Sequence, residues 1–318
     1  MKKNSLKHRL NIPGQREFDV VGLGLNAYDY LCVIRGFPRP GDKFQMKSLH
    51  FAPGGQVATA LCCLARLGFK TRYIGKFGDD LAGKASMESL QKEGIDLEYS
   101  KIIPGTNNQQ AFIMVDDETG ERTIIWNRPS SLKWEPGEIP ISPLVMGRVL
   151  LLDGHDIGAC IKSAKHAKAN GIPVVLDAET VEEGTRDLVA LSDVVIGDKK
   201  FLELFSGEKD VEKGLLILAE SGPNFAAVTM GDKGALGYYN GNFFRSRGFN
   251  VKVIDTTGAG DAFHGAFIAG MLYGWDADLV MKFADAVAAL SCRGMGGRSS
   301  LPDREEVLEF LKRNGINP

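Results

Sequence analysis

A turn of small residues in front of an apolar helix carries the strongest chemical signal in the chain. Residues 255–261 read Asp-Thr-Thr-Gly-Ala-Gly-Asp. We expect Gly258, Ala259 and Gly260 to present unpaired N–H donors at the helix N-terminus, where an anion is favoured. Asp261 stands in the first helical turn, so we expect its carboxylate to stay ionised at neutral pH. Amide donors beside a carboxylate suit phosphoryl transfer to an alcohol, whereas the simpler interpretation is a capping aspartate and a plain turn.

Other carboxylates are predicted at the ends of strands, where the ligands of open α/β sheets bind. They are Asp29, Asp153, Asp177 and Asp198. Because the turn before Asp261 is also expected at a strand end, all of them can converge on one crevice. For Asp29 the local pattern fits a solvated loop acid equally well.

A second glycine-rich segment opens a predicted helix at residues 56–66. Gly54 and Gly55 precede it, so backbone donors can approach a ligand hydroxyl there. The alternative is a tight turn without a ligand.

The elements that must position these residues alternate between apolar strands and helical patterns, most regularly from residue 149 onward. An extended β-branched run at 251–254 leads into the turn. This alternation predicts an α/β fold with a doubly wound, mostly parallel sheet and helices on both faces. We expect one domain over residues 1–318.

Two stretches, at about 28–52 and 109–128, are extended and lack helical periodicity. The second predicts a β-hairpin with its turn at 117–120. Both stretches are expected to form a small separate sheet, which suits a lid or an association surface.

Composition excludes several classes of protein. The 318 residues are 44% hydrophobic with a formal net charge of −2 and no basic block, which gives no reason to expect nucleic acid or an anionic membrane as partner. No segment approaches the roughly 20 apolar residues of a membrane span. The five cysteines are scattered without a Cys-x-x-Cys pair, so we expect reduced thiols in a cytoplasmic protein.

Two other nucleotide-binding patterns are weak or missing. Gly22-x-Gly24-x-x-Ala27 is similar to a dinucleotide fingerprint, but Pro38 and Pro40 follow where a Rossmann unit needs a helix. No Gly-x4-Gly-Lys-Ser/Thr loop occurs, so the glycine turn is the expected phosphate holder.

The stretch from Asp255 to Phe267 closely resembles the C-terminal signature of the ribokinase-like (PfkB-type) carbohydrate kinases. The helix after Gly54 and Gly55 resembles the first signature of that family, and the two extended stretches match its β-lid. The similarity spans residues 20–311. It implies an ATP-dependent sugar kinase that uses ATP and Mg²⁺, with K⁺ as a further cofactor of many members.

The resemblance also implies a role for each matching residue. The catalytic group is Asp261 as base, with Gly258, Ala259 and Gly260 as the anion hole. The sugar-binding group is Asp29, Gly54, Gly55, Gln56 and Asp153. The ATP-binding group is Asp198, Thr229, Gly231, Gly234, Thr257 and Cys292. Asp255 and Thr257, with backbone near Gly297, are the candidates for a monovalent-cation loop.

This chain departs from the family pattern in three places. Thr59 stands where an Asn is expected, which argues against ribose, and the magnesium-linked Asn-x-x-Glu reads Asp198-Lys-Lys-Phe201. Local motifs are most similar to those of ketohexokinases and sulfofructose kinases, which favours a fructose-like ketose phosphorylated at a primary hydroxyl. Arg128 and Arg298 can then meet an anionic or highly hydroxylated substrate. Exposed lid edges suggest a homodimer through the lid.

Other functions stay open at this point. A kinase for another small polyol, a sugar acid or a nucleoside fits the same motifs. A catalytically silent sugar- or nucleotide-sensing protein would share the fold, because a fold does not fix a function. A nucleotide-cofactor oxidoreductase lacks the helix that it would need after Gly24.

Overall fold

The computed structural model describes residues 6, 10–118 and 122–318. Its main sheet has eight strands in the order β14-β13-β12-β11-β10-β9-β1-β4, and the pairs from β12 to β4 are parallel. The strands are β1 (Phe18–Leu23), β4 (Thr71–Ile74), β9 (Gly147–Leu152), β10 (Val174–Ala178), β11 (Val194–Asp198), β12 (Phe225–Thr229), β13 (Ala235–Tyr239) and β14 (Asn242–Ser246). β13 and β14 form an antiparallel hairpin at one edge.

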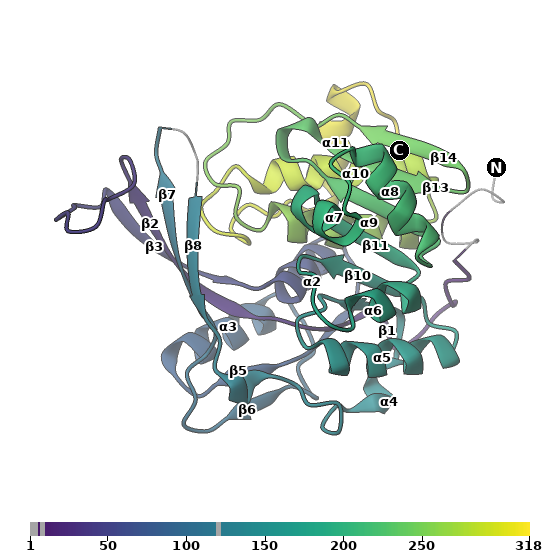
Figure 1. The fold of residues 1–318 in the computed structure, drawn as a ribbon, viewed down its shortest axis with the longest axis horizontal. Helices are drawn as coiled ribbons and strands as arrows, with labels where there is room; N and C mark the ends of the chain where they lie inside the picture. The colour runs from purple at the N-terminus through teal and green to yellow at the C-terminus, as the bar shows by residue number, and fades with distance from the viewer. Residues whose placement is uncertain (1–5, 7–9, 119–121) are drawn as a thin grey trace.

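Helices cover both faces of this sheet (Figure 1). One face carries α2 (Gln56–Arg66), α3 (Leu81–Lys92), α9 (Ala259–Tyr273), α10 (Ala277–Ser291) and α11 (Arg304–Arg313). The other carries α4 (Ile141–Leu144), α5 (Ile157–Ala169), α6 (Thr185–Leu191), α7 (Lys199–Ser206) and α8 (Val211–Glu220). Short 3-10 turns lie at η2 (Ser130–Leu132) and η3 (Gly231–Lys233).

Alternation along the strands explains these two layers. In β9, Val149 and Leu151 pack into the core under α2 and α9, whereas Leu150 and Leu152 pack into the core under α5. Because neighbouring side chains of a strand point to opposite faces, an uninterrupted apolar run is buried on both sides. The predicted doubly wound α/β fold is confirmed.

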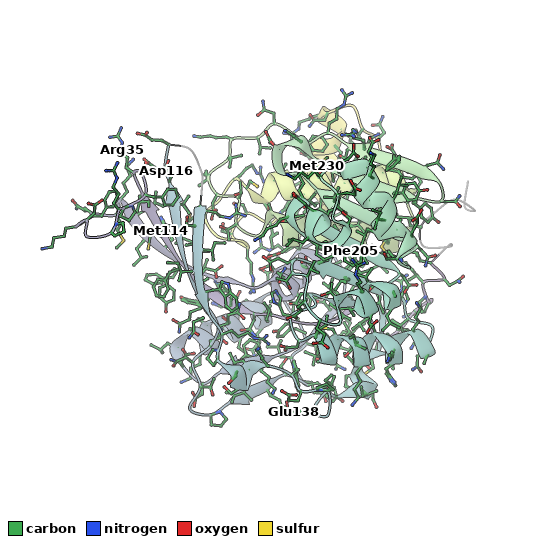
Figure 2. The ribbon with its side chains drawn as sticks, viewed as in Figure 1. Arg35, Met114, Asp116, Glu138, Phe205 and Met230 are labelled. Atoms are coloured by element: carbon green, nitrogen blue, oxygen red, sulfur yellow. The ribbon has the colours of Figure 1, made fainter. Side chains whose placement is uncertain are left out.

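A second sheet projects from the main body and has the order β3-β2-β7-β8 (Figure 1). Its strands are β2 (Ala27–Ile34), β3 (Ser48–Gly54), β7 (Gln110–Asp116) and β8 (Arg122–Asn127), and a short pair, β5 (Lys76–Gly78) with β6 (Lys101–Ile103), lies nearby. The two stretches predicted to be extended therefore build one small sheet. Arg35 and Asp116 mark its far tip (Figure 2).

Two local expectations need adjustment. Residues 251–254 lie outside any strand, and Val253 and Ile254 are about half exposed. Asp29 lies inside β2 and not beyond the end of a strand. The predicted hairpin of β7 and β8 pairs as expected, but residues 119–121 of its turn lie outside the described part of the chain. Among the described residues, no helix combines the length and the hydropathy of a membrane span.

Candidate active site

The turn at the start of α9 is held by close backbone packing. Gly258 caps α9 in the left-handed region with φ of 75°, and a Cβ at this position would lie 2.6 Å from the Cα of Gly297. The Asp255 carboxylate accepts hydrogen bonds from Thr257 N (2.9 Å), Thr257 Oγ1 (2.8 Å) and Gly296 N (2.8 Å). Asp255 thus fastens this turn to the loop after α10, and glycine is required where the two backbones touch.

The free donors of the turn differ from the sequence expectation at one residue. Ala259 N–H donates to the carbonyl of Thr256 at 3.2 Å, so this amide already has an acceptor. Within the described chain, the N–H groups of Gly258, Gly260 and Asp261 have no protein acceptor. The amides that remain available to an anion are therefore these three at the positive end of α9, and Ala259 lines the cleft beside them.

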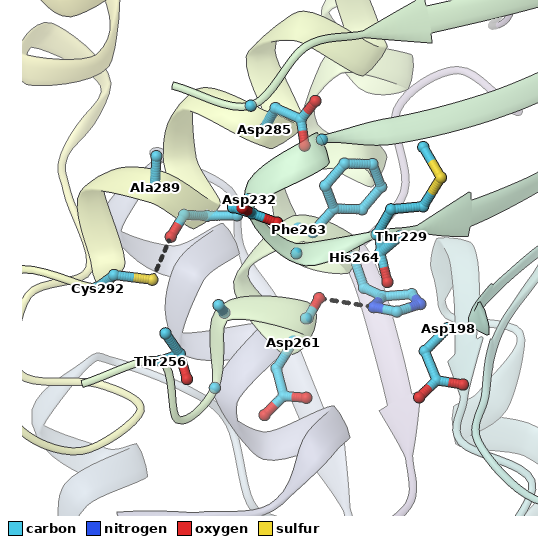
Figure 3. A pocket seen from close by; sticks show the side chains of 18 of the residues that line it. Asp198, Thr229, Asp232, Thr256, Asp261, Phe263, His264, Asp285, Ala289 and Cys292 are labelled. Carbon is cyan, nitrogen blue, oxygen red and sulfur yellow. Dashed lines mark hydrogen bonds between the residues drawn. The ribbon is translucent and has the colours of Figure 1, made fainter. Parts of the chain in front are cut away.

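His264 contacts the backbone of this turn. Its Nδ1 lies 2.7 Å from the carbonyl oxygen of Gly260 (Figure 3), and its Nε2 lies 3.2 Å from the carbonyl oxygen of Ile196. Both of these oxygens can only accept, and the shorter contact favours the proton on Nδ1. The Nε2 of His264 also lies 3.3 Å from Asp177 Oδ1. Burial lowers the pKa of His264 and raises that of Asp177 well above its usual value, so burial favours the neutral form of both side chains.

The Asp261 side chain points away from His264 (Figure 3). No described residue donates a hydrogen bond to its carboxylate, and burial together with the neighbouring Asp177 raises its pKa to about 7. The expectation of a fully ionised Asp261 at neutral pH is therefore wrong, because desolvation outweighs the helix dipole. A carboxylate that titrates near neutrality suits a general base.

The turn opens into a cleft of about 840 Å³. Ten of the predicted site residues line it: Gln56, Asp198, Thr229, Gly231, Gly234, Gly258, Ala259, Gly260, Asp261 and Cys292. They come from the ends of β11 and β12, the first turns of α2 and α9, and the end of α10. Of the strand-end residues predicted to converge on one crevice, Asp177, Asp198 and the turn before Asp261 line this cleft, whereas Asp29 and Asp153 do not.

Thr257 has a different place from the one predicted. Its hydroxyl donates to Asp255, and its neighbour Thr256 is the threonine that lines the cleft. Asp198 lines the cleft while its Oδ1 caps α7 by accepting from Phe201 N at 2.7 Å. Phe201 is fully buried in the core, so it supplies no ligand where the family pattern has a Glu.

A second group of predicted residues lies behind the cleft. Asp29 is 5% exposed and its carboxylate faces Gly54 so closely that a Cβ there would overlap it. Burial raises the pKa of Asp29 to about 7, although the charge of Arg298 opposes this. Gly55 caps α2 with φ of 92°. The charge of Asp29 is the smallest of the effects that raise the pKa of Asp261.

Asp153 and Arg128 are both engaged by the protein. Asp153 Oδ2 accepts from Leu25 N at 2.6 Å, and burial raises its pKa. Arg128 forms a two-pronged ion pair with Asp156, at 2.8 Å for each prong. Neither residue lines the cleft, and a contact of either with a ligand stays a prediction.

Three residues near the cleft were absent from the predicted site: Arg122, His155 and His264. Arg122 of β8 donates to Thr256 Oγ1, which links the second sheet to the turn. His155 lies 2.6 Å from Gln56 Oε1 and 3.3 Å from Glu179 Oε2. The sequence offered one signal for each histidine, namely its closeness to a predicted carboxylate. His155 follows Asp153 by two residues, and His264 follows Asp261 by three residues on the same helix.

The side-chain oxygens near the cleft fit the two expected cations, Mg²⁺ and a monovalent ion, only in part. Among the described residues, no group of three or more His, Cys, Asp or Glu side chains is arranged to hold a metal ion. Asp198 and Glu179 line the cleft as oxygen donors, which suits Mg²⁺ that arrives on phosphates and keeps its waters. Asp255 uses three of the roughly four lone-pair sites of a carboxylate, which leaves one for a monovalent cation.

Comparisons with known proteins agree with this geometry. A family model described as pfkB family carbohydrate kinase matches residues 18–304. A ribokinase from Haemophilus influenzae is 29% identical over 302 residues, covering 91% of this chain and 97% of the relative. A 5-dehydro-2-deoxygluconokinase from Clostridium perfringens is 27% identical over 322 residues, covering 94% of each. The crystal structure of a putative ribokinase from Agrobacterium tumefaciens superposes with a TM-score of 0.86 at 24% identity, covering 93% of this chain and 98% of that one.

Proposed function

This chain belongs to the pfkB family of carbohydrate kinases, and from that premise we propose that it transfers the γ-phosphoryl group of ATP to a hydroxyl of a fructose-like ketose. One observation carries the proposal: the Asp261 carboxylate lies free beside three unpaired amides at the N-terminus of α9. The ketose rests on local motifs alone.

The turn supplies the two kinds of group that phosphoryl transfer needs, a carboxylate that takes a proton and amides that stabilise negative charge. Asp261 accepts the proton of the acceptor hydroxyl as its oxygen bonds to the γ-phosphorus. The bond from that phosphorus to the β–γ bridging oxygen breaks, and ADP leaves. The amides of Gly258, Gly260 and Asp261 stabilise the negative charge of the transferred group. Mg²⁺ bound to the phosphates would neutralise part of their charge, and Asp198 and Glu179, which line the cleft, would be able to hold it.

The second sheet is proposed to act as the lid that excludes water. Arg122 supports this role, because it reaches from β8 to Thr256 at the edge of the cleft.

The same sheet exposes large apolar side chains, with Ile125 59% and Trp126 61% exposed, which supports a homodimer through the lid. Sedimentation of the wild type against Ile125→Lys tests the dimer. The cytoplasmic location stays a prediction.

The kinase proposal is tested by ADP release from ATP and Mg²⁺ over ketoses, aldoses, polyols and nucleosides, with K⁺ replaced by Na⁺ in parallel. Turnover with a ketose as the best acceptor supports the full proposal, and a better nucleoside or aldose corrects the acceptor. Binding of acceptor and ATP without any turnover would favour the sensing protein. A rate that falls when Na⁺ replaces K⁺ supports a cation at Asp255.

A further inference from the structure

We propose that Asp285 on α10 reads the base of the phosphoryl donor, and that this kinase therefore accepts GTP as well as ATP. The inference rests on the proposed kinase function and adds the base of its donor nucleotide. It is carried by a buried carboxylate that lines the cleft and has an oxygen without a partner.

One face of α10 lines the cleft with small side chains and a carboxylate. Asp285, Ala288, Ala289 and Cys292 all line it, and their spacing of three, four and seven residues places them on one side of the helix. Apolar residues of the segment between β14 and α9, Phe249 among them, line the cleft as well. The alanines leave room for a flat ring, and Asp285 is the charged residue of this face.

Phosphate groups find their donors at another part of the cleft. The unpaired amides of Gly258, Gly260 and Asp261 stand at the N-terminus of α9. Figure 3 shows Asp285 above Phe263 and Asp261 below it. The cleft of about 840 Å³ has the size of small-molecule sites, which is roughly 300–1,000 Å³. A nucleotide whose γ-phosphate meets the amides can therefore place its base against the face of α10 that carries Asp285.

The carboxylate of Asp285 is not used up by the protein. The residue is 7% exposed, and within the described part of the chain its Oδ2 has no hydrogen-bond partner. Burial raises the pKa of Asp285 to about 6, and the nearby hydroxyl of Ser246 opposes this rise. Because a buried polar atom without a partner is unfavourable, this oxygen suits a ligand that brings a hydrogen-bond donor.

An ionised carboxylate can only accept hydrogen bonds, and this property distinguishes the two purines. Guanine carries N1–H and its exocyclic amino group side by side, so both carboxylate oxygens can accept from one edge of the ring. Adenine carries its amino group beside N1, which is itself an acceptor and gains nothing from the second oxygen. Asp285 thus pairs with adenine through one oxygen and with guanine through two, and the donor site admits both bases.

The transfer from GTP is the same as that from ATP. The acceptor oxygen bonds to the γ-phosphorus, the bond from that phosphorus to the β–γ bridging oxygen breaks, and GDP leaves. Asp261 takes the proton of the acceptor hydroxyl, as it does when ADP is the product.

The kinetic test measures nucleoside diphosphate release from ATP, GTP and ITP with Mg²⁺ and the best acceptor of the panel, at pH 8, where Asp285 is ionised. The base of ITP keeps N1–H but lacks the amino group of guanine. We expect the kcat/KM for GTP to lie within about tenfold of that for ATP and at least about fivefold above that for ITP. A kcat/KM for GTP about a hundredfold or more below that for ATP, or equal to that for ITP, would overturn the inference and leave the kinase function intact.

Variants of Asp285 assign the effect to its carboxylate. The side-chain amide of Asp285→Asn has a donor and an acceptor, which match N1 and the amino group of adenine, so the ratio of kcat/KM for GTP to that for ATP should fall at least about tenfold. Asp285→Ala should make GTP and ITP equal within about twofold, because it removes both oxygens. An unchanged ratio in Asp285→Asn would contradict the inference.

Asp232→Asn is the matched control. Asp232 is another carboxylate that lines the cleft, and it lies in η3 and not on α10. Its replacement should change the kcat/KM for ATP and GTP alike. A selective loss of GTP turnover in this variant, equal to that in Asp285→Asn, would mean that Asp285 is not the residue that reads the base.

A binding measurement separates the inference from the kinase proposal. Calorimetry with non-hydrolysable analogues of ATP and GTP needs no turnover. We expect wild type to bind the two analogues within about tenfold of each other, and Asp285→Asn to bind the GTP analogue at least about tenfold more weakly. That result supports the inference even if no acceptor is phosphorylated. Equal binding of the GTP analogue by wild type and variant, or no binding by wild type, overturns it.

Discussion

The imidazole Nδ1 of His264 donates to the carbonyl of Gly260 at 2.7 Å, and that carbonyl belongs to the same peptide group as the N–H of Asp261. A hydrogen bond to a carbonyl polarises its peptide and makes the attached N–H a better donor. The buried His264 thereby strengthens one of the three amides that we propose to face the transferred phosphoryl group.

We predict that His264→Leu lowers kcat about tenfold, because it removes this polarisation but keeps the amide itself. His264→Asn is the matched control. In this chain Asn170 and Asn314 each donate from their side chain to the carbonyl four residues earlier, at 2.9 and 2.8 Å. Steady-state kinetics should place the Asn variant nearer to wild type than the Leu variant, and equal losses in both would contradict a role of the donor.

Gly258→Ala should destabilise the protein and reduce turnover together. Its positive φ costs an L-residue roughly 1–2 kcal/mol, and the added Cβ would lie 2.6 Å from the Cα of Gly297. Thermal unfolding and kcat report the two effects. Gly260→Ala is the control for unfolding, because a Cβ there meets no atom within 4 Å. An unchanged unfolding temperature for Gly258→Ala would contradict the proposed close packing.

The kcat/KM for the acceptor should fall about tenfold for each pH unit below 7, because Asp261 must be unprotonated to take a proton and its pKa is about 7. Above that pH the rate should level off. A profile measured with saturating ATP and Mg²⁺ checks this, and a limb that stays flat down to about pH 5 would argue against Asp261 as the titrating base.

The raised pKa of Asp261 also makes the stability of the folded protein depend on pH. The folded state raises the pKa of Asp261 above its ordinary value of 3.8, so folding favours the protonated form and stability from this group is lost as pH rises through about 7. Asp261→Asn should therefore raise the unfolding temperature more at about pH 8 than at about pH 5. An equal change at both pH values would mean that the shift is absent.

We expect His155→Phe to raise the KM for the acceptor about tenfold and to leave the KM for ATP nearly unchanged. The reason is that His155 holds the side-chain oxygen of Gln56, whose amide lines the cleft. His155→Gln keeps a donor and should lie between wild type and the Phe variant. A parallel rise in the KM for ATP would point to a general loss of structure.

The sequence predicted the parts of this site that depend on local pattern. Gly258, Gly260 and Asp261 were identifiable because the whole stretch from Asp255 to Phe267 resembles a family signature, and alternating strands and helices placed them at one edge of the sheet. The second sheet followed from its lack of helical periodicity.

What the sequence could not predict depends on distant partners. Arg128 is neutralised by Asp156, and Arg298 holds the backbone of Gly54 across 244 positions. The raised pKa of Asp261 likewise comes from burial and from Asp177, which is distant in the chain. Ala259 donates to Thr256 because of the way the turn closes, a detail that spacing alone does not reveal.

The most direct test of Asp261 as the base measures ADP release by wild type and Asp261→Asn, with ATP and Mg²⁺ and the best acceptor of the panel. Calorimetry of both proteins establishes that acceptor and ATP still bind. If Asp261 is the base, we expect a kcat lower by roughly 10²–10⁴-fold in the variant, with both ligands still bound. A variant that keeps kcat within a few-fold of wild type would contradict Asp261 as the base.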